Sequence, residues 1–441
     1  MSDTLASEPN VEALDRSAIE RQTMRRVFRR TLPFVVLAYV IAHIDRSNIA
    51  VAAFQMNKDL GLSAAEYGFA AGIFFIPYCL LEIPSNLALV RYGARRWIAR
   101  IMISWGLVGF LMAFCVTGPY SLYVVRFLLG AAEAGLYPGA LYYLSLWFPV
   151  QYRARVFAIF GTALPISNLI GAPLAASLLE LDGLLGLRGW QWVFIIESLP
   201  PLIFGYIFLK IMADKPEDAD WLAPVQRAWL TRSLAEAAPV AANGRSSGWR
   251  QLLNPEVLGL SLVFAGSASA TTALGLWMPQ ILKEFGLSNF GAATLNMFPY
   301  ASACLAMLWW GAWSDRSNER FWRTVLPLLV IAVSLAATLF TGSLVTLLIL
   351  LSFTLVGTYA VKGPFWALVN EWIPAGNAAG SIAQINALSN LAGFGATYLL
   401  GYIKNETGSF SQACLPLVAS AFAAAITLRL LRRRRNNFAA A

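Results

Sequence analysis

Two pairs of oppositely charged residues interrupt apolar stretches of this sequence. Arg126 and Glu133 lie seven residues apart inside an apolar run from about residue 120 to 148. In a helix, this spacing puts both side chains on one face, about 10 Å apart along the axis. Asp45 and Arg46 interrupt the first apolar run at its middle. Each such charge costs roughly 2.5–3.5 kcal/mol to insert into a bilayer, and it persists where it faces a polar cavity or an opposite charge.

These charges allow two interpretations. One is a buried structural network of ion pairs. The other is a binding and proton-relay site for a small anion. An arginine side chain stays charged and can hold a carboxylate with two parallel hydrogen bonds, and a carboxylic acid in a low-dielectric site can take up a proton near physiological pH. We favour the binding site.

The composition predicts a membrane protein. Of the 441 residues, 58% are hydrophobic and only 13% are charged, and the mean hydropathy is +0.60. These values lie well outside the averages of soluble domains. The formal net charge of +9 does not indicate nucleic-acid binding, because aromatic residues are not interleaved with a basic face and no nucleic-acid motif is present.

The chain divides into about twelve apolar runs, each long enough to cross a bilayer with some tilt. We therefore expect an all-α integral membrane protein with twelve transmembrane helices. The predicted spans are 31–56, 66–90, 96–116, 120–148, 154–179, 189–211, 255–282, 291–313, 322–341, 344–372, 378–403 and 411–430.

The distribution of Lys and Arg predicts that both termini are cytoplasmic. With that orientation only four of these residues lie in external loops, and the opposite orientation would reverse the imbalance. The four are Lys58, Arg188, Lys283 and Lys404. No cleavable signal peptide is evident, because about thirty residues of polar sequence precede the first apolar run.

Sequence motifs in the first half of the chain recur six spans later. The basic turn from Asn86 to Arg96 corresponds to Gly311–Arg316, and Pro138 with Trp147-Phe-Pro149 corresponds to Pro364 with Trp372-Ile-Pro374. Such matched signals indicate two parallel repeats. We predict six-helix bundles at 31–211 and 254–431, joined by a polar cytoplasmic linker at 212–253. Residues 1–30 are most simply a disordered tail with a basic anchor next to the membrane, and residues 432–441 form a second tail.

Several motifs carry a family resemblance. Gly311-x-x-x-Asp315-Arg316 resembles the loop signature of the major facilitator superfamily, although the first-half copy has Val90 where that family usually has Asp. Four further segments resemble the anion:cation symporter family within it, and most closely its bacterial uptake carriers for tartrate-like, sugar-acid and aromatic carboxylates. These segments are His43–Asn48, Met56–Ser63, Ile83–Asn86 with Gly93–Arg100, and Trp192–Pro200.

The resemblance implies roles for individual residues. Arg46 and Arg126 would contact a carboxylate, with Tyr78 lining the site, while Asp45 and Glu133 would carry protons. The loop motif would make Asp315 and Arg316 gating residues. In the second half, the residues that would form the wall of the site are Trp277, Trp366, Asn386 and Asn390. For these four, packing or hydrogen bonding between helices is the alternative.

For each of three further ionisable residues, the sequence allows two roles. Glu82 is a gate or a structural partner, His43 a packing residue or a proton relay, and Lys362 a structural partner of Glu371 or a substrate contact. With a single histidine and four scattered cysteines, neither a metal site nor a disulfide framework is expected. No cofactor is expected either.

Among functional classes, a secondary transporter agrees best with two repeats and buried charges of both signs. A membrane enzyme is disfavoured because no nucleophile–base pair with its own orienting group is present, and a receptor would add a soluble signalling domain. The sequence has no phosphate-binding loop of the kind that would indicate an ATP-driven pump. We expect proton-coupled uptake of a small organic carboxylate across the bacterial inner membrane by a monomer. An anion exchanger or facilitator of the same fold is the alternative.

Overall fold

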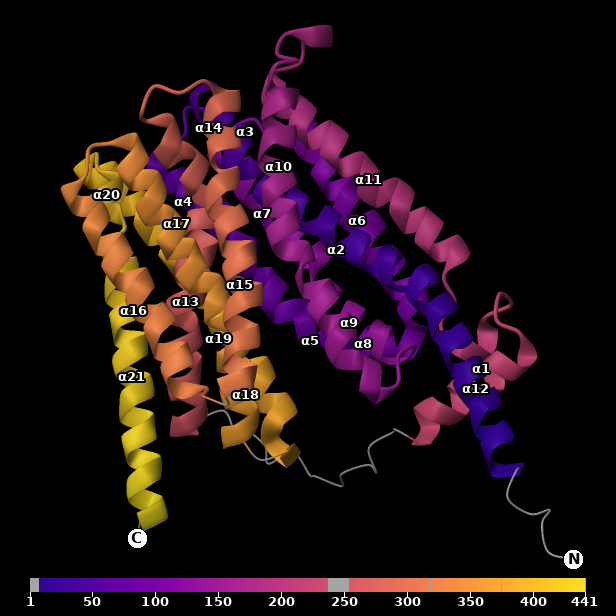
Figure 1. Ribbon diagram of the computed structural model, residues 1–441. Coiled ribbons are helices and arrows are strands. Elements are labelled where there is room, and N and C mark those ends of the chain that lie inside the picture. Colours follow the sequence, from indigo (N-terminus) through magenta and orange to yellow (C-terminus); the bar gives the residue numbers. More distant parts are fainter. Residues whose placement is uncertain (1–7, 237–253, 318, 374, 441) are drawn as a thin grey trace, which may run out of the picture.

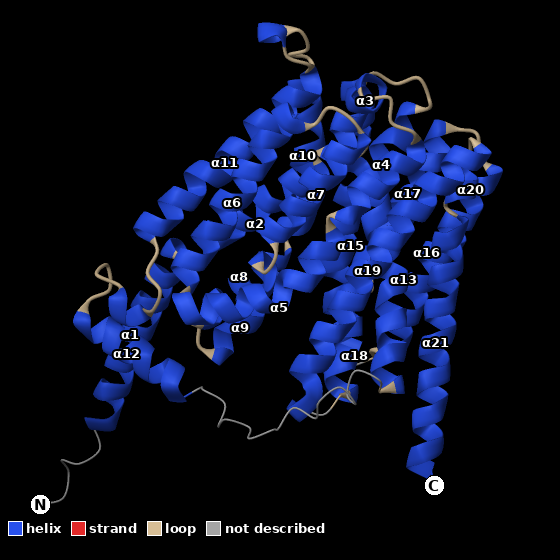
Figure 2. Cartoon of the chain, turned by 180° about the vertical axis from the view of Figure 1, so that it is seen from behind, coloured by secondary structure: helices blue, strands red, loops and turns tan. Residues whose placement is uncertain are grey.

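The computed structural model describes residues 8–236, 254–317, 319–373 and 375–440, and these residues form helices joined by turns, with no strand among them (Figure 2). The predicted all-α class is therefore confirmed. Nine helical segments of the described chain are long and apolar enough to cross a membrane. Predicted spans 120–148, 291–313 and 378–403 are not among these nine, so twelve spans stays a prediction.

The helices fall into two groups joined by a linker (Figure 1). The first group comprises α2 Leu32–Ser47, α3 Ile49–Asp59, α4 Ala64–Ile73, α5 Phe75–Tyr92, α6 Ala94–Cys115, α7 Pro119–Glu133, α8 Leu136–Ser145, α9 Val150–Gly161, α10 Ala163–Leu179 and α11 Gly189–Ile211. The second comprises α13 Pro255–Lys283, α14 Asn289–Leu295, α15 Met297–Ser317, α16 Phe321–Ala337, α17 Leu344–Ala360, α18 Lys362–Trp372, α19 Ala375–Thr407, α20 Phe410–Ala413 and α21 Leu415–Ala440. Helices α1 Glu8–Arg30 and α12 Pro224–Glu236 lie outside both groups.

Prolines break several long apolar runs into two helices. A proline has no N–H to donate to the carbonyl four residues earlier, so the helix ends there or bends. Helix α4 ends four residues before Pro77, α9 four residues before Pro165, and α17 four residues before Pro364. Between α7 and α8 the break falls at Gly135, whose φ of 89° lies in the left-handed region that glycine tolerates. These breaks place helix ends in the middle of the apolar runs.

Both ends of the described chain and α12, which belongs to the predicted linker, lie at one end of the two bundles, which we call the linker end; we call the opposite end the far end (Figure 1). The expectation of a disordered N-terminal tail is wrong for residues 8–30, because they form α1. Arg26 Nη1 on α1 donates a 3.0 Å hydrogen bond to Gln226 Oε1 on α12. The C-terminal tail is also helical, since α21 runs on to Ala440. Predicted linker residues 237–253 lie outside the described residues.

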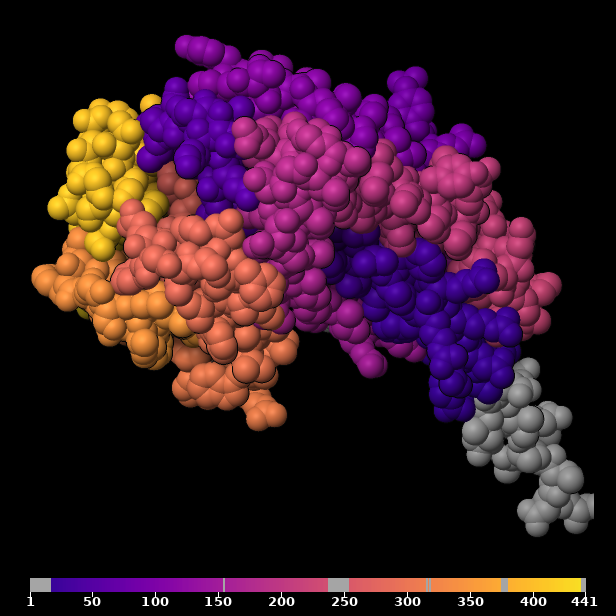
Figure 3. All heavy atoms as spheres, turned by 90° about the horizontal axis from the view of Figure 1, so that it is seen from above, coloured from indigo at the N-terminus to yellow at the C-terminus, as the bar shows by residue number. Residues whose placement is uncertain are grey.

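The two bundles are packed together at the far end (Figure 3). Tyr67 on α4 donates a 2.8 Å hydrogen bond from its hydroxyl to the carbonyl of Leu276 on α13. Gly68 lets α4 approach α19 closely, because a Cβ at this position would lie 2.9 Å from the carbonyl oxygen of Thr397 and 3.2 Å from the Cα of Gly401. At the linker end, α8 and α9 pack mainly on helices of their own bundle. The described conformation is therefore closed at the far end.

The contact between Gly68 and α19 generates a prediction. Gly68→Ala should disfavour the closed far end, because the added methyl group meets backbone atoms that cannot rotate away. A cysteine placed at Gln280, which accepts a hydrogen bond from Asn57 across the bundles, should then react faster with a maleimide in a protein lacking the four native cysteines. Gly395→Ala on α19 is the control, since no atom lies within 4 Å of its added Cβ. Equal labelling rates in the two variants would contradict the view that the contact between Gly68 and α19 helps to close the far end.

Candidate substrate-binding site

The centre of the site is an ion pair between Arg46 Nη2 on α2 and Glu133 Oε1 on α7. Glu133 is the last residue of α7, two residues before the break at Gly135, and its side chain is 1% exposed. The Arg46 side chain keeps 19% of its surface accessible although the residue lies in the middle of an apolar run. The acid is thus enclosed, and its basic partner remains reachable.

An aromatic wall surrounds this ion pair. The guanidinium carbon of Arg46 lies 4.8 Å from the ring centre of Tyr78 and 5.1 Å from that of Phe74. Arg126 lies over the same Phe74 ring at 5.2 Å. An aromatic face stabilises a desolvated cation by about 2 kcal/mol without neutralising it. Phe74 therefore links the two arginines, although nothing in the sequence distinguishes it from other apolar residues.

Arg126 is fully buried on α7. Its Nε and Nη2 donate hydrogen bonds of 3.3 and 3.2 Å to the carbonyls of Ala70 and Ala71. These carbonyls belong to the last turn of α4, where backbone acceptors lack partners within the helix. Nη1 has no partner among the described residues. Arg126 is thus held in place by backbone acceptors, and one of its donor groups has no partner among the described residues.

Asp45 is directed away from Arg46, because consecutive residues in a helix project about 100° apart. Its Oδ2 accepts a 2.7 Å hydrogen bond from the indole Nε1 of Trp105 on α6. The side chain is 6% exposed. The two charges that are adjacent in the sequence therefore belong to different environments, and Asp45 lies inside the first bundle.

The predicted wall residues of the second bundle separate into different surroundings. Trp277 is 1% exposed, donates to the Thr397 carbonyl at 3.2 Å and meets the Tyr67 ring at 4.8 Å, so it belongs to the far-end packing. Trp366 packs on Phe264, with ring centres 4.9 Å apart. No described contact joins either tryptophan to Arg46 or Arg126.

The two asparagines lie on α19. Asn386 donates a 3.3 Å hydrogen bond from Nδ2 to Glu82 Oε1 on α5, which joins the two bundles. Asn390 lies one turn further along the same helix and is half-buried. This contact is compatible with both interpretations of Glu82, as a gate and as a structural partner.

Lys362 begins α18, and its Nζ lies 4.3 Å from the ring centre of Tyr359. The Tyr359 hydroxyl accepts a 3.5 Å hydrogen bond from Nδ2 of Asn168 on α10, in the first bundle. Glu371 pairs with Arg320 at 3.6 Å, so it is not the partner of Lys362. Within the described residues Lys362 has no acidic partner, and it lies where the two bundles meet.

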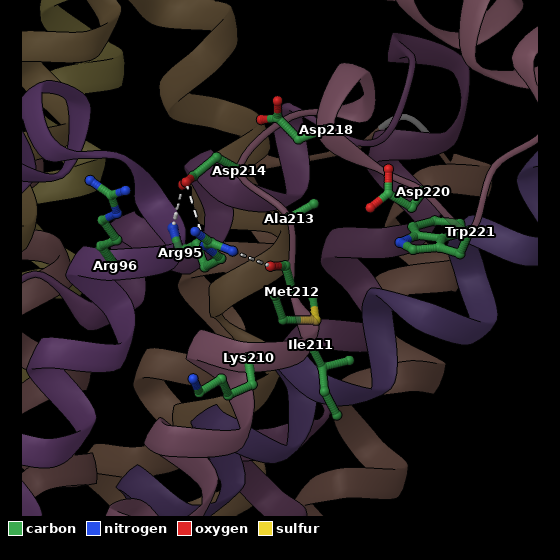
Figure 4. A pocket seen from close by; sticks show the side chains of 10 residues that line it. All are labelled: Arg95, Arg96, Lys210, Ile211, Met212, Ala213, Asp214, Asp218, Asp220 and Trp221. Atoms are coloured by element: carbon green, nitrogen blue, oxygen red, sulfur yellow. Dashed lines mark hydrogen bonds and ion pairs between the residues drawn. The ribbon is translucent and has the colours of Figure 1, made fainter.

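The predicted gating residues end α15 at the linker end. Arg316 is exposed, and the side chain of Asp315 lies outside the described residues. In the first bundle, where Val90 stands at the acidic position of the loop motif, an acid from just after the end of α11 contacts the start of α6. Asp214 accepts a 2.7 Å hydrogen bond from the backbone N–H of Arg95 and pairs with its guanidinium at 3.6 Å (Figure 4).

Asp214 also lines a polar pocket of about 480 Å³ at the linker end (Figure 4). The pocket is formed where α6 begins and α11 runs into the linker, and none of the predicted binding residues lines it. Its acidic and basic side chains are Arg95, Arg96, Lys210, Asp214, Asp218 and Asp220. The equal numbers of acids and bases give this pocket no preference for an anion.

The chain is similar to known membrane transporters over most of its length. A "Putative tartrate transporter" of Agrobacterium vitis is 43% identical over 95% of this chain and 96% of its own. A "Putative metabolite transport protein NicT" of Pseudomonas putida is 36% identical over 87% of this chain and 88% of its own.

Solved structures share the fold. A bacterial homologue of the human lysosomal transporter Spinster, in an inward-facing and occupied conformation, superimposes with a TM-score of 0.73 at 19% identity, over 91% of this chain and 96% of that one. A D-xylose-proton symporter gives a TM-score of 0.72 at 14% identity, with coverages of 91% and 96%.

The family model for the Major Facilitator Superfamily matches residues 35–397. This match includes the arginine pair, the bundle contacts and most of both helical groups. The family and these relatives consist of transporters rather than enzymes. The chain is thus a multi-pass membrane transporter that belongs to the Major Facilitator Superfamily.

Proposed function

We propose that the protein takes up a small organic carboxylate, such as tartrate, a sugar acid or an aromatic acid, together with protons by alternating access. The observation that carries this proposal is the enclosed Arg46–Glu133 pair beside Arg126, with its free Nη1. The name of the Agrobacterium vitis relative supports an acidic substrate. We further propose the bacterial plasma membrane as its location and both termini as cytoplasmic, which the Lys and Arg distribution supports.

The ion pair suggests how binding and protonation are coupled. While Glu133 is ionised it occupies Arg46, and a substrate carboxylate competes for the same guanidinium. Protonation of Glu133 removes its charge and frees Arg46 to hold the substrate. Arg126 supplies a second donor from the same helix as Glu133. Proton and anion then bind together, and the site regains a balanced charge.

Lys362 provides a contact from the second bundle. It faces the first bundle beside Tyr359 and Asn168 and has no acidic partner among the described residues. A second acidic or hydroxyl-bearing group on the substrate can reach it while the first carboxylate is held by an arginine. Such a substrate bridges the bundles, so its binding can favour their closure.

Uptake in proteoliposomes tests the function directly. Vesicles that contain the purified protein should accumulate radiolabelled tartrate, or an unlabelled acid that competes with it, when the outside is acidic. A protonophore should abolish accumulation. Exchange of labelled for unlabelled acid without any response to the pH gradient would favour the exchanger, and no movement of any carboxylate tested would refute the proposal.

Arg126→Lys keeps the positive charge but removes the planar fork. Losing one charge-assisted hydrogen bond costs about 1.5–3 kcal/mol, which corresponds to roughly a ten- to hundredfold loss of affinity. The measurement is the dissociation constant of the transported acid, obtained from thermal stabilisation of the purified protein. Arg188→Lys in an exposed loop is the control. Affinity equal to the wild type would move Arg126 from the binding site to the structural network.

Glu133→Gln mimics the protonated acid and leaves Arg46 without a fixed carboxylate. This variant should bind and exchange substrate but lose accumulation driven by a pH gradient. Acidification should tighten substrate binding to the wild type, because binding and protonation favour each other reciprocally, and should leave this variant's affinity largely unchanged. Continued protonophore-sensitive accumulation by Glu133→Gln would exclude Glu133 as the essential proton carrier.

Lys362→Met retains an unbranched side chain without its charge. Affinity for a dicarboxylate such as tartrate should fall about tenfold or more, because one charged contact is lost, while affinity for a monocarboxylate such as benzoate should change much less. Competition binding with both acids measures this difference. An equal loss for the two acids would indicate that Lys362 stabilises the fold rather than contacting the second group.

A further inference from the structure

The polar pocket at the linker end is separate from the proposed substrate-binding site. Its volume is about 480 Å³, and it lies where α6 begins, where α11 ends and where the linker starts (Figure 4). Arg46, Arg126 and Lys362 do not line it. Pockets that hold small molecules have volumes of about 300–1,000 Å³. This pocket is therefore large enough for a ligand of its own.

Two of the bases that line the pocket have no acidic partner. Arg95 pairs with Asp214 at 3.6 Å, so these two side chains neutralise each other. Arg96 and Lys210 are exposed, and neither forms an ion pair with a carboxylate of the described residues. The Lys210 ammonium group lies 5.6 Å from the ring centre of Tyr206, which leaves its charge unneutralised. The pocket thus has two uncompensated positive charges on its helical side.

The acids lie on the other side of the pocket. Asp218 and Asp220 belong to the linker segment after α11, opposite the two unpaired bases (Figure 4). Asp218 has no basic partner among the described residues, and Asp220 has a 3.9 Å contact with Arg227. Positive and negative charges are therefore separated across the pocket. A ligand with one negative and one positive end matches this separation, whereas a simple anion is repelled by the acids.

The acidic segment is fixed at both of its ends. Asp214 accepts a 2.7 Å hydrogen bond from the backbone N–H of Arg95 at the start of α6. The ring of Trp221 stacks on that of Trp147, in the turn between α8 and α9, with ring centres 5.5 Å apart and planes inclined by 17°. A site that is held in place before its ligand arrives costs less to order on binding. The fold thus holds this segment opposite the bases in advance.

We propose that this pocket binds a small soluble zwitterion, with a phosphate or carboxylate at one end and an ammonium group at the other. Arg96 and Lys210 hold the acidic end through charge-assisted hydrogen bonds, and Asp218 and Asp220 accept hydrogen bonds from the ammonium group. Each half of such a ligand is attracted by one side of the pocket and repelled by the other. The complete zwitterion therefore binds more tightly than either half.

The lining favours a soluble molecule over a lipid. Met212 and Ala213 are buried, so the accessible apolar side chains of the lining are Ile211 and Trp221. The ring of Trp221 already stacks on Trp147 and has the guanidinium carbon of Arg30 5.7 Å from its centre. Little apolar surface is left in the pocket for an acyl chain.

An occupant of the pocket joins the first bundle to the linker, because the bases belong to α6 and α11 and the acids to the linker. The linker leads on to α13 in the second bundle. Binding can therefore favour one arrangement of the two bundles over another. This consequence rests on the proposed function, but the binding itself does not.

Calorimetric titration of the purified protein in an uncharged detergent, without a transported acid, tests the site with O-phosphoethanolamine as the probe. This zwitterion should bind about tenfold or more tightly than inorganic phosphate or ethanolamine, because only the zwitterion makes charged contacts on both sides. Arg96→Gln and Lys210→Gln should each weaken its binding about tenfold. Lys215→Gln, at an exposed position outside the lining, is the control and should not.

Asp218→Asn distinguishes the two ends of the ligand. Binding of O-phosphoethanolamine should weaken about tenfold, because the ammonium group loses a charged acceptor. Binding of inorganic phosphate should instead tighten, because a repelling charge is removed. Glu217→Gln, one residue earlier and also exposed, is the matched control and should change neither affinity. All these positions are exposed, so the variants should keep the melting temperature of the unliganded wild type.

No measurable binding, equal affinities for O-phosphoethanolamine and phosphate, or equal losses in the control variants would overturn the proposal. Binding confined to phosphatidylethanolamine in mixed micelles would also overturn it, because the ligand would then be a lipid. Arg126→Lys should leave the affinity unchanged, and a loss would move the probe to the substrate site. Because no transported acid is present, failure to transport any carboxylate would refute the proposed function and leave this result unaffected.

Discussion

A charge inside an apolar bundle must be neutralised or held by oriented dipoles, and this constraint organises the first half of the molecule. Arg46 is neutralised by Glu133, whereas Arg126 is held by two backbone carbonyls of α4. The ring of Phe74 contacts both guanidinium groups. Since the two arginines are stabilised in different ways, they do not compete for one carboxylate. If an anion binds here as we propose, neither arginine is left in an apolar environment.

The breaks in the helices make this arrangement possible. A continuous helix has no free carbonyls in its middle, but the end of α4 before Pro77 exposes those of Ala70 and Ala71 to Arg126. The glycine break after α7 likewise makes Glu133 a terminal residue. The backbone groups left free at these breaks are satisfied by side chains, as the carbonyl of Ala134 is by the hydroxyl of Ser85 at 2.7 Å. The helix breaks that interrupt the apolar runs thus also position the polar groups of the site.

Close contacts of small residues complete the transporter at the far end, whereas charged side chains dominate the linker end. Gly68 allows α4 and α19 to touch through their backbones, and Tyr67 and Asn57 add hydrogen bonds between the bundles there. At the linker end, Asp214 holds the start of α6 through Arg95. The far end is thus held by contacts between the two bundles, whereas the Asp214–Arg95 pair joins the first bundle to the linker.

The sequence by itself determined the all-α class, most apolar runs and the presence of buried charges, because periodicity, prolines and the cost of a charge are local properties. It identified Arg46, Arg126 and Glu133 as candidate site residues, and the tertiary structure joined two of them. Only the fold showed that Asp45 and Arg46 have different partners, that Trp277 belongs to the far-end packing, and that Asp214 contacts Arg95. Likewise, the helix at residues 8–30 packs on α12, a segment some two hundred residues away. Which side chains meet depends on how distant helices pack, and no local pattern encodes that choice.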